Sequence, residues 1–185
     1  MGFSQEDESE KPEAAWENPV LVIVRGIKYN ESYKMLTGGI CMGSYLNPGN
    51  EAFAVALNSE IYVDKTGLLT YTNKVMNTLQ GYICNSRPRR FGKSFAANML
   101  AAYYSKGCDS RALFADYAIC KASSFEKHLN QYDVIHFDVQ WCMMDAGNAD
   151  QVVEYINHGI LQELKEKYGE LIPDTVKTAY GAMSY

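Results

Sequence analysis

The feature that most constrains this chain is residues 82–104, where a short apolar run, a basic loop and a helical pattern follow one another without a break. Residues 82–84 (YIC) form the apolar run, which is typical of a buried strand. From Lys93 to Tyr103, apolar residues recur at spacings of three and four, which predicts a helix closed by Gly107. A strand that leads through a loop directly into a helix favours folds in which sheet and helices alternate.

The loop between this strand and helix has the residues of a phosphate-binding site. At the start of a helix, backbone N–H groups face an anion, and Gly92 lets the backbone approach phosphate oxygens closely. Lys93 would reach the β- and γ-phosphates, and the Ser94 hydroxyl would ligate Mg²⁺. The usual pattern has glycine where this chain has Arg87, so an exposed basic turn is the alternative interpretation.

Other segments also alternate between strand-like and helix-like patterns. Residues 20–24 (VLVIV) and residues 134–139 (VIHFDV) are apolar, β-branched runs that predict strands. Amphipathic spacing over residues 149–168 predicts a helix closed by Gly169. Shorter patterns predict a helix at 51–57, an extended piece at 61–63, a helix toward the end of 68–79 and a capped helix ending near 129. Together, these predicted strands and helices favour an α/β protein.

Composition narrows the class of protein. With 185 residues, 47% of them hydrophobic, the chain can bury a core as about one domain. The net charge of −5 supplies no basic field for nucleic acid, and no apolar run is long enough to cross a bilayer. Five cysteines without a Cys-x-x-Cys pair predict reduced thiols and a cytoplasmic location. No histidine pair has the spacing of a zinc site.

Several segments together resemble a known family. They are YVDKT at residues 62–66, RPRRFGKS at 87–94, the aromatic pair Tyr103-Tyr104, Leu113-Phe114, and YDVIHFD at 132–138. In this order they resemble the predicted AAA-ATPase-like family over residues 46–139. In that family arginine commonly opens the phosphate loop, so Arg87 agrees with the resemblance.

The resemblance implies a P-loop NTPase fold of the branch related to AAA and STAND ATPases: a three-layer α/β/α sandwich with a mostly parallel sheet. It also implies binding of ATP and Mg²⁺ through a variant Walker A loop, and ATP hydrolysis by the full-length family. Longer members often carry a restriction-endonuclease-like domain. The expected nucleotide-binding residues are Arg87, Pro88, Arg89, Arg90, Phe91, Gly92, Lys93, Ser94 and Phe95.

The family's second acidic motif, an apolar strand ending in Asp-Glu, is not found between residue 139 and Tyr185. We therefore expect a domain that is incomplete at its C-terminus, with weak or absent turnover, since this motif holds Mg²⁺ and polarises the attacking water. Asp138 is the internal candidate for the metal, although Val139 and Gln140 follow it instead of Glu. The favoured interpretation places Asp138 at a strand end near the site.

The N-terminal residues 1–41 lie outside the resemblance and are expected to be a disordered tail or an extension, with residues 42–185 forming the partial nucleotide-binding domain. If Met42 is the true start, the run at 20–24 has no place in the sheet.

Alternatives stay open at several positions. The arginines at 87, 89 and 90 could contact phosphates, contact a neighbouring subunit's nucleotide or form a solvated turn. Asp64 and Lys65 could lie near the nucleotide or serve as a cap and an ion pair. For the whole chain, the alternatives are a non-catalytic interaction module derived from a degenerate P-loop NTPase and a small kinase. The kinase is disfavoured because no arginine follows Arg111. The oligomeric state is open.

Overall fold

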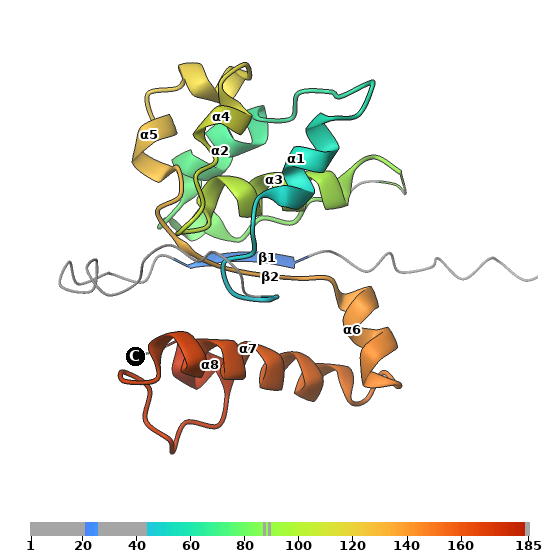
Figure 1. Ribbon diagram of the computed structural model, residues 1–185, viewed down its shortest axis with the longest axis vertical. Helices are drawn as coiled ribbons and strands as arrows, with labels where there is room; N and C mark the ends of the chain where they lie inside the picture. The colour runs from blue at the N-terminus through green and yellow to red at the C-terminus, as the bar shows by residue number, and fades with distance from the viewer. Residues whose placement is uncertain (1–20, 26–43, 87, 89, 184–185) are drawn as a thin grey trace, which may run out of the picture.

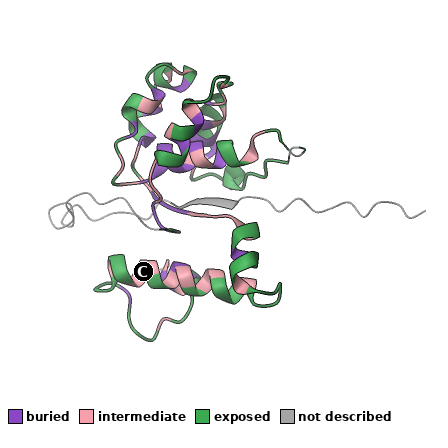
Figure 2. Ribbon diagram, turned by 45° about the vertical axis from the view of Figure 1, so that its right-hand side comes forward, coloured by how far each residue is buried: buried purple, intermediate pink, exposed green. Residues whose placement is uncertain are grey.

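The computed structural model describes residues 21–25, 44–86, 88 and 90–183 (Figure 1). Figures 1 and 2 show a pair of strands with helices on both sides. The strands are β1 (Leu21–Arg25) and β2 (Asp133–Phe137). The helices on one side are α1 (Glu51–Leu57), α2 (Gly67–Val75), α3 (Lys93–Tyr104), α4 (Arg111–Phe114) and α5 (Phe125–His128), with 3-10 turns η2 (Leu79–Gly81) and η3 (Ala118–Lys121); those on the other side are α6 (Val139–Ala146), α7 (Val152–Tyr168) and α8 (Ala179–Ala182).

Strand β2 has a neighbour on each edge. On one edge it pairs antiparallel with β1, and Ile23 lies opposite Ile135. On the other edge the His136 N–H donates to the Tyr45 carbonyl at 2.8 Å, and the Asn47 N–H donates to the Val134 carbonyl at 2.7 Å. The mostly parallel sheet implied by the resemblance is not seen within the described ranges, where both strands run antiparallel.

The two sides of β2 face two separate cores. Successive side chains of a strand point to opposite faces, so Val134 and Ile135 enter different layers. Val134 is fully buried with residues of α1–α5 such as Phe53 and Leu69, and Ile135 is buried with Ile160 and other residues of α7 and α8. A helix–strand–helix arrangement therefore exists, although with a smaller sheet than expected.

Helix α3 is the centre of the first core. Ala102, Tyr103 and Tyr104 are fully buried, and the small alanines of this helix let it pack closely against its neighbours. The Tyr103 hydroxyl donates to the Phe125 carbonyl at 2.9 Å, and the Tyr104 hydroxyl donates to Asn73 Oδ1 at 2.6 Å. The aromatic pair is therefore core packing with satisfied hydroxyls.

The direction of α3 places its first turn above the carboxyl end of β2. The last residues of α3 lie beside the entry to β2, because the Tyr132 N–H donates to the Tyr104 carbonyl at 2.9 Å and the Lys106 N–H donates to the Tyr132 carbonyl at 2.8 Å. The helix then extends back over the strand (Figure 1). The loop before Lys93 and the end of β2 at Asp138 consequently share one side of the molecule (Figures 1 and 2).

Two sequence expectations before α3 are wrong. Residues 82–84 form no strand, and Tyr82 is 96% exposed. A strand needs a neighbour that accepts its N–H groups and donates to its C=O groups, and none of the described strands pairs with this run. In residues 68–79 the helix is α2, which occupies the first part of the segment, not its end. Helix α3 ends at Tyr104 and does not reach Gly107. The reason is that Ser105 adopts an extended conformation and forms a β-bridge with Tyr132.

The strand expected at residues 20–24 is confirmed as β1. It pairs with β2, so it has a place in the sheet, which differs from what a start at Met42 would imply. The assignment of residues 1–41 as an extension and of Met42 as the start stays a prediction, since positions 1–20 and 26–43 are outside the described residues.

Among the cysteines, Cys84, Cys120 and Cys142 are free. Cys108 is disulfide-bonded, so the expectation of reduced thiols is wrong for this residue.

A buried carboxylate joins the layers where β2 begins. Asp133, whose side chain is 4% exposed, accepts hydrogen bonds from Asn47 Nδ2 at 2.7 Å, Lys106 Nζ at 2.6 Å and the Tyr168 hydroxyl at 2.6 Å. Burial alone would raise the pKa of Asp133, but the bonds from Lys106, Tyr168 and Asn47 outweigh it and hold the pKa below its ordinary value. The strand is thereby fixed to segments from both helical sides.

Candidate phosphate-binding site

The loop that leads into α3 turns through two left-handed backbone positions. Arg90 has φ of 66° and Gly92 has φ of 75°, and the helix begins at the next residue, Lys93. Glycine adopts this conformation without strain, whereas a residue with a Cβ resists it. Gly92 is the N-cap residue and has no side chain to satisfy the first N–H groups of α3. The positive end of the helix therefore has no side-chain cap from residue 92 and favours an anion.

The residues expected to hold the nucleotide are accessible. Ser94 is exposed in the first turn of α3, and Lys93 is half-buried beside it. Phe91 and Phe95 are 60% and 46% exposed, and Pro88 and Arg90 are also exposed. Arg87 and Arg89, which were predicted to belong to the same loop, lie outside the described residues.

A second segment, residues 64–66, contacts this loop and is called the DKT strap below. Lys65 Nζ donates to the Phe91 carbonyl at 2.8 Å. Asp64 accepts the N–H of Thr66 at 2.7 Å and the N–H of Ala118 at 3.1 Å. Burial raises the pKa of Asp64, but these backbone hydrogen bonds outweigh it and lower the pKa below its ordinary value. Of the open alternatives, Lys65 therefore lies at the loop, and Asp64 fixes the turn before α2.

Asp138 directly follows β2 and caps the next helix. Its Oδ1 accepts the N–H of Gln140 at 2.8 Å and the N–H of Trp141 at 3.4 Å, which makes it the N-cap of α6. This position confirms the strand end in the favoured expectation, whereas the nearness of Asp138 to the nucleotide stays a prediction. Its alternative role as a Mg²⁺ ligand stays a prediction. Within residues 44–86 and 90–183, no cluster of three or more His, Cys, Asp or Glu side chains could hold a metal.

His136 lies on β2 two residues before Asp138. Its side chain alternates to the same face as Val134, toward α1–α5. Its Nε2 atom is buried and has no hydrogen-bond partner in the described part of the chain. Burial lowers the pKa of His136, although the nearby Asp138 partly opposes that shift. The imidazole is therefore a neutral, half-buried group at ordinary pH.

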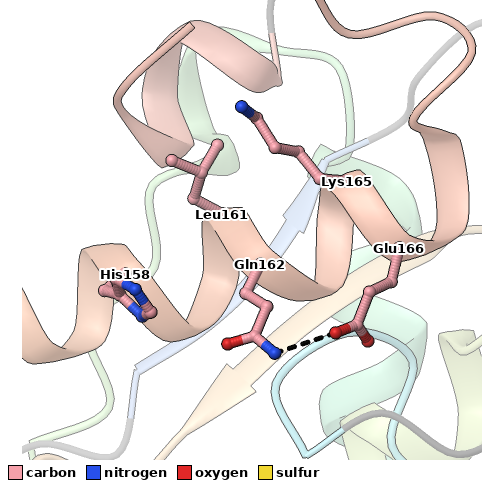
Figure 3. A pocket seen from close by; sticks show the side chains of 5 residues that line it. All are labelled: His158, Leu161, Gln162, Lys165 and Glu166. Carbon is pink, nitrogen blue, oxygen red and sulfur yellow. Dashed lines mark hydrogen bonds between the residues drawn. The ribbon is translucent and has the colours of Figure 1, made fainter. Parts of the chain in front are cut away.

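A surface hollow lies elsewhere, along α7 (Figure 3). His158, Leu161, Gln162, Lys165 and Glu166 line it, and Gln162 Nε2 donates to Glu166 Oε1 at 2.8 Å. An adjoining hollow adds further carboxylates, Glu154 and Glu163. Helix α7 is on the opposite side of the strands from α3 (Figure 1). Carboxylates repel a triphosphate, so this surface does not suit a nucleotide's phosphates.

The fold and the loop together define a class: helices on both faces of a strand layer, with a glycine-lysine-serine turn opening the central helix. The chain belongs to the predicted AAA-ATPase family, whose model matches residues 51–183. This match confirms the family resemblance and includes both the DKT strap and the described part of the phosphate loop. No curated protein and no solved structure matches the chain. None of the described helices is both long and apolar enough to cross a bilayer.

Sequence reasoning missed one contact at the site and three of the described helices. The contact between Lys65 and the Phe91 carbonyl joins residues 26 positions apart, and no local pattern encodes it. The missed helices are α4, α6 and α8. For α6 a signal was present, because Asp138 precedes a run of helix-compatible residues, which is the pattern of an N-cap.

Proposed function

We propose that this chain binds ATP together with Mg²⁺ through the variant Walker A loop at residues 87–94. One observation carries the proposal: Gly92 at φ of 75° opens α3, with Lys93 and Ser94 in its first turn, in a chain of the predicted AAA-ATPase family. Such a turn directs backbone N–H groups and the positive end of the helix dipole toward phosphate oxygens.

Each residue has a separate role in this proposal. Lys93 neutralises the β- and γ-phosphates, Gly92 permits their close approach, and the Ser94 hydroxyl ligates Mg²⁺. A hydroxyl, phosphate oxygens and water form the oxygen-rich ligand set that Mg²⁺ prefers. Asp138, which directly follows β2, is the candidate for a further ligand. Arg87, Pro88, Arg89, Arg90 and Phe91 complete the loop, and Phe95 follows it.

We propose weak or absent hydrolysis by these 185 residues. In-line attack needs a carboxylate that polarises water beside the metal-holding aspartate. Val139 and Gln140 follow Asp138, and neither side chain can act as that base. In addition, Asp138 Oδ1 already accepts two backbone N–H groups of α6. The three-layer α/β/α sandwich of a P-loop NTPase belongs to this proposal too.

Titration with a fluorescent ATP analogue in the presence of Mg²⁺ tests nucleotide binding. We expect Lys93→Ala to weaken affinity by about tenfold or more, equivalent to about 1.4 kcal/mol per tenfold. Lys165→Ala removes the same charge from the α7 hollow and is the matched control, with affinity expected to stay at the wild-type value. Unchanged affinity in Lys93→Ala would reject the proposal, and a loss confined to Lys165→Ala would move the binding site to α7.

A non-catalytic interaction module is the second candidate function. It is favoured by large apolar side chains that stand exposed near the loop: Leu79 is 91% exposed and Tyr82 is 96% exposed. Exposed apolar clusters commonly mark surfaces that bind partners. A stably folded protein that shows no ATP binding at millimolar concentration would select this alternative.

A cytoplasmic location is part of the proposal. Three described cysteines are free thiols, whereas the disulfide at Cys108 points to an oxidising environment. Thiol counting on protein isolated without reductant tests the location: five reactive thiols under denaturing conditions support it, and three oppose it.

A further inference from the structure

The ammonium group of Lys65 packs directly against the turn that opens α3. Its Nζ donates to the Phe91 carbonyl at 2.8 Å. A Cβ built on Gly92 would lie 2.3 Å from the same Nζ, whereas the next nearest atoms would be at 3.7 Å. The lysine head thus occupies the space that a side chain at position 92 would take, and it contacts two consecutive residues of the loop.

Lys65 is presented from a firmly held segment. On one side Asp64 accepts the N–H groups of Thr66 and Ala118. On the other side Thr66 is fully buried, and its Oγ1 accepts the Ile119 N–H at 3.2 Å. These bonds tie the DKT strap to η3 and to the start of α2. The backbone of Lys65 is therefore anchored independently of the loop that its side chain contacts.

The bond to Phe91 fixes the orientation of one peptide group. In a planar trans peptide, the C=O of one residue and the N–H of the next point in opposite directions. Because Lys65 holds the Phe91 carbonyl, the Gly92 N–H must point away from Lys65. Because the donor is an ammonium group, this is a charge-assisted hydrogen bond, which is stronger than a neutral one.

We propose that Lys65 is a positioning residue for the phosphate loop: it holds the Phe91–Gly92 peptide so that the Gly92 N–H faces the nucleotide's phosphates. This inference rests on the proposed function. Lys65 stabilises the conformation of the loop, and Lys93 makes the direct contact with the phosphates. The strap and the loop then act as one unit, with the first motif preorganising the second.

The binding test compares three variants by titration with Mg²⁺-ATP, Mg²⁺-ADP and adenosine. Lys65→Met keeps the length of the side chain and removes the donor, and we expect about tenfold weaker binding of both ATP and ADP with adenosine unaffected. Lys65→Arg restores a cationic donor and should recover most of that loss. Lys121→Ala removes an exposed lysine from η3, next to the strap's anchor, and should bind as the wild type does.

Amide hydrogen exchange without nucleotide is the second measurement. Lys65→Met should speed exchange severalfold at Ala96, whose N–H donates to the Gly92 carbonyl at 3.0 Å, while the amides of Met99 and Ala102 keep their wild-type rates. Unchanged exchange at Ala96 overturns the inference, as does undiminished ATP affinity in Lys65→Met when the wild type binds ATP. If the wild type binds no ATP, the proposed function fails, and the exchange rates alone decide whether Lys65 positions the loop.

Discussion

At the scale of single residues, the site depends on a few backbone and charge details. Gly92 takes a left-handed conformation against the Lys65 ammonium, and Asp64 and Thr66 hold the lysine's backbone. Each of these contacts is short and specific. A single substitution can therefore change the loop without unfolding the protein.

Gly92→Ala should lower the free energy of unfolding by about 1–2 kcal/mol, because an L-residue resists φ of 75°. It should also weaken ATP binding, since its Cβ displaces the Lys65 ammonium. Gly147 is the matched control: its φ is 78°, yet a Cβ there would meet nothing within 4 Å. Urea unfolding and ATP titration of both alanine variants separate the effects. Equal ATP affinities for the two variants would contradict the role of position 92.

At the scale of elements, local pattern predicted those helices and strands whose apolar face is complete within the segment. Helices α1, α5 and α7 and strands β1 and β2 agree with their expected positions to within a few residues. Residues 82–84 have the composition of a strand but form none, because a strand is stable only beside a partner.

Packing between elements depends on bonds between distant residues, as Glu163 of α7 illustrates. Its carboxylate accepts the N–H groups of Ser44 at 2.8 Å, Tyr45 at 3.0 Å and Leu46 at 2.7 Å.

Glu163→Ala should lower the free energy of unfolding by about 1–3 kcal/mol, because it leaves three backbone donors at the edge of β2 without their acceptor. Glu166→Ala, one turn further along α7, removes a carboxylate that accepts an exposed hydrogen bond from Gln162 and should change stability by less than about 0.5 kcal/mol. Chemical denaturation monitored by circular dichroism gives both values. Similar losses in the two variants would show that the contact of α7 with residues 44–46 contributes little.

At the scale of the whole molecule, buried titratable groups make stability depend on pH. Burial lowers the pKa of both His128 and His136 below the ordinary 6.5, and Asp138 only partly opposes this at His136. The unfolded chain therefore binds more protons than the folded one once the pH falls below about 6.5. The lowered pKa of Asp133 acts separately, below its ordinary 3.8.

We expect the free energy of unfolding to be constant from pH 8 to about pH 7 and to fall as the pH decreases from 6.5 toward 5. His136→Asn should make this decrease smaller, because it removes one of the two groups. Urea unfolding at half-unit pH intervals measures the slope. A slope identical in the wild type and the variant would show that His136 titrates alike in the folded and unfolded states.

The sequence by itself determined the family, the helix that begins at Lys93 and the strand before Asp138, because these depend on local periodicity and on contiguous motifs. Only the tertiary structure decided that β1 and β2 pair antiparallel, that Lys65 holds the Phe91 carbonyl and that Asp133 joins both helical sides. The physical reason is that hydrogen bonds and ion pairs form between groups brought close in space. Their partners lie 26 to 35 positions apart along the chain in the cases of Lys65 and Tyr168, so no local pattern specifies them.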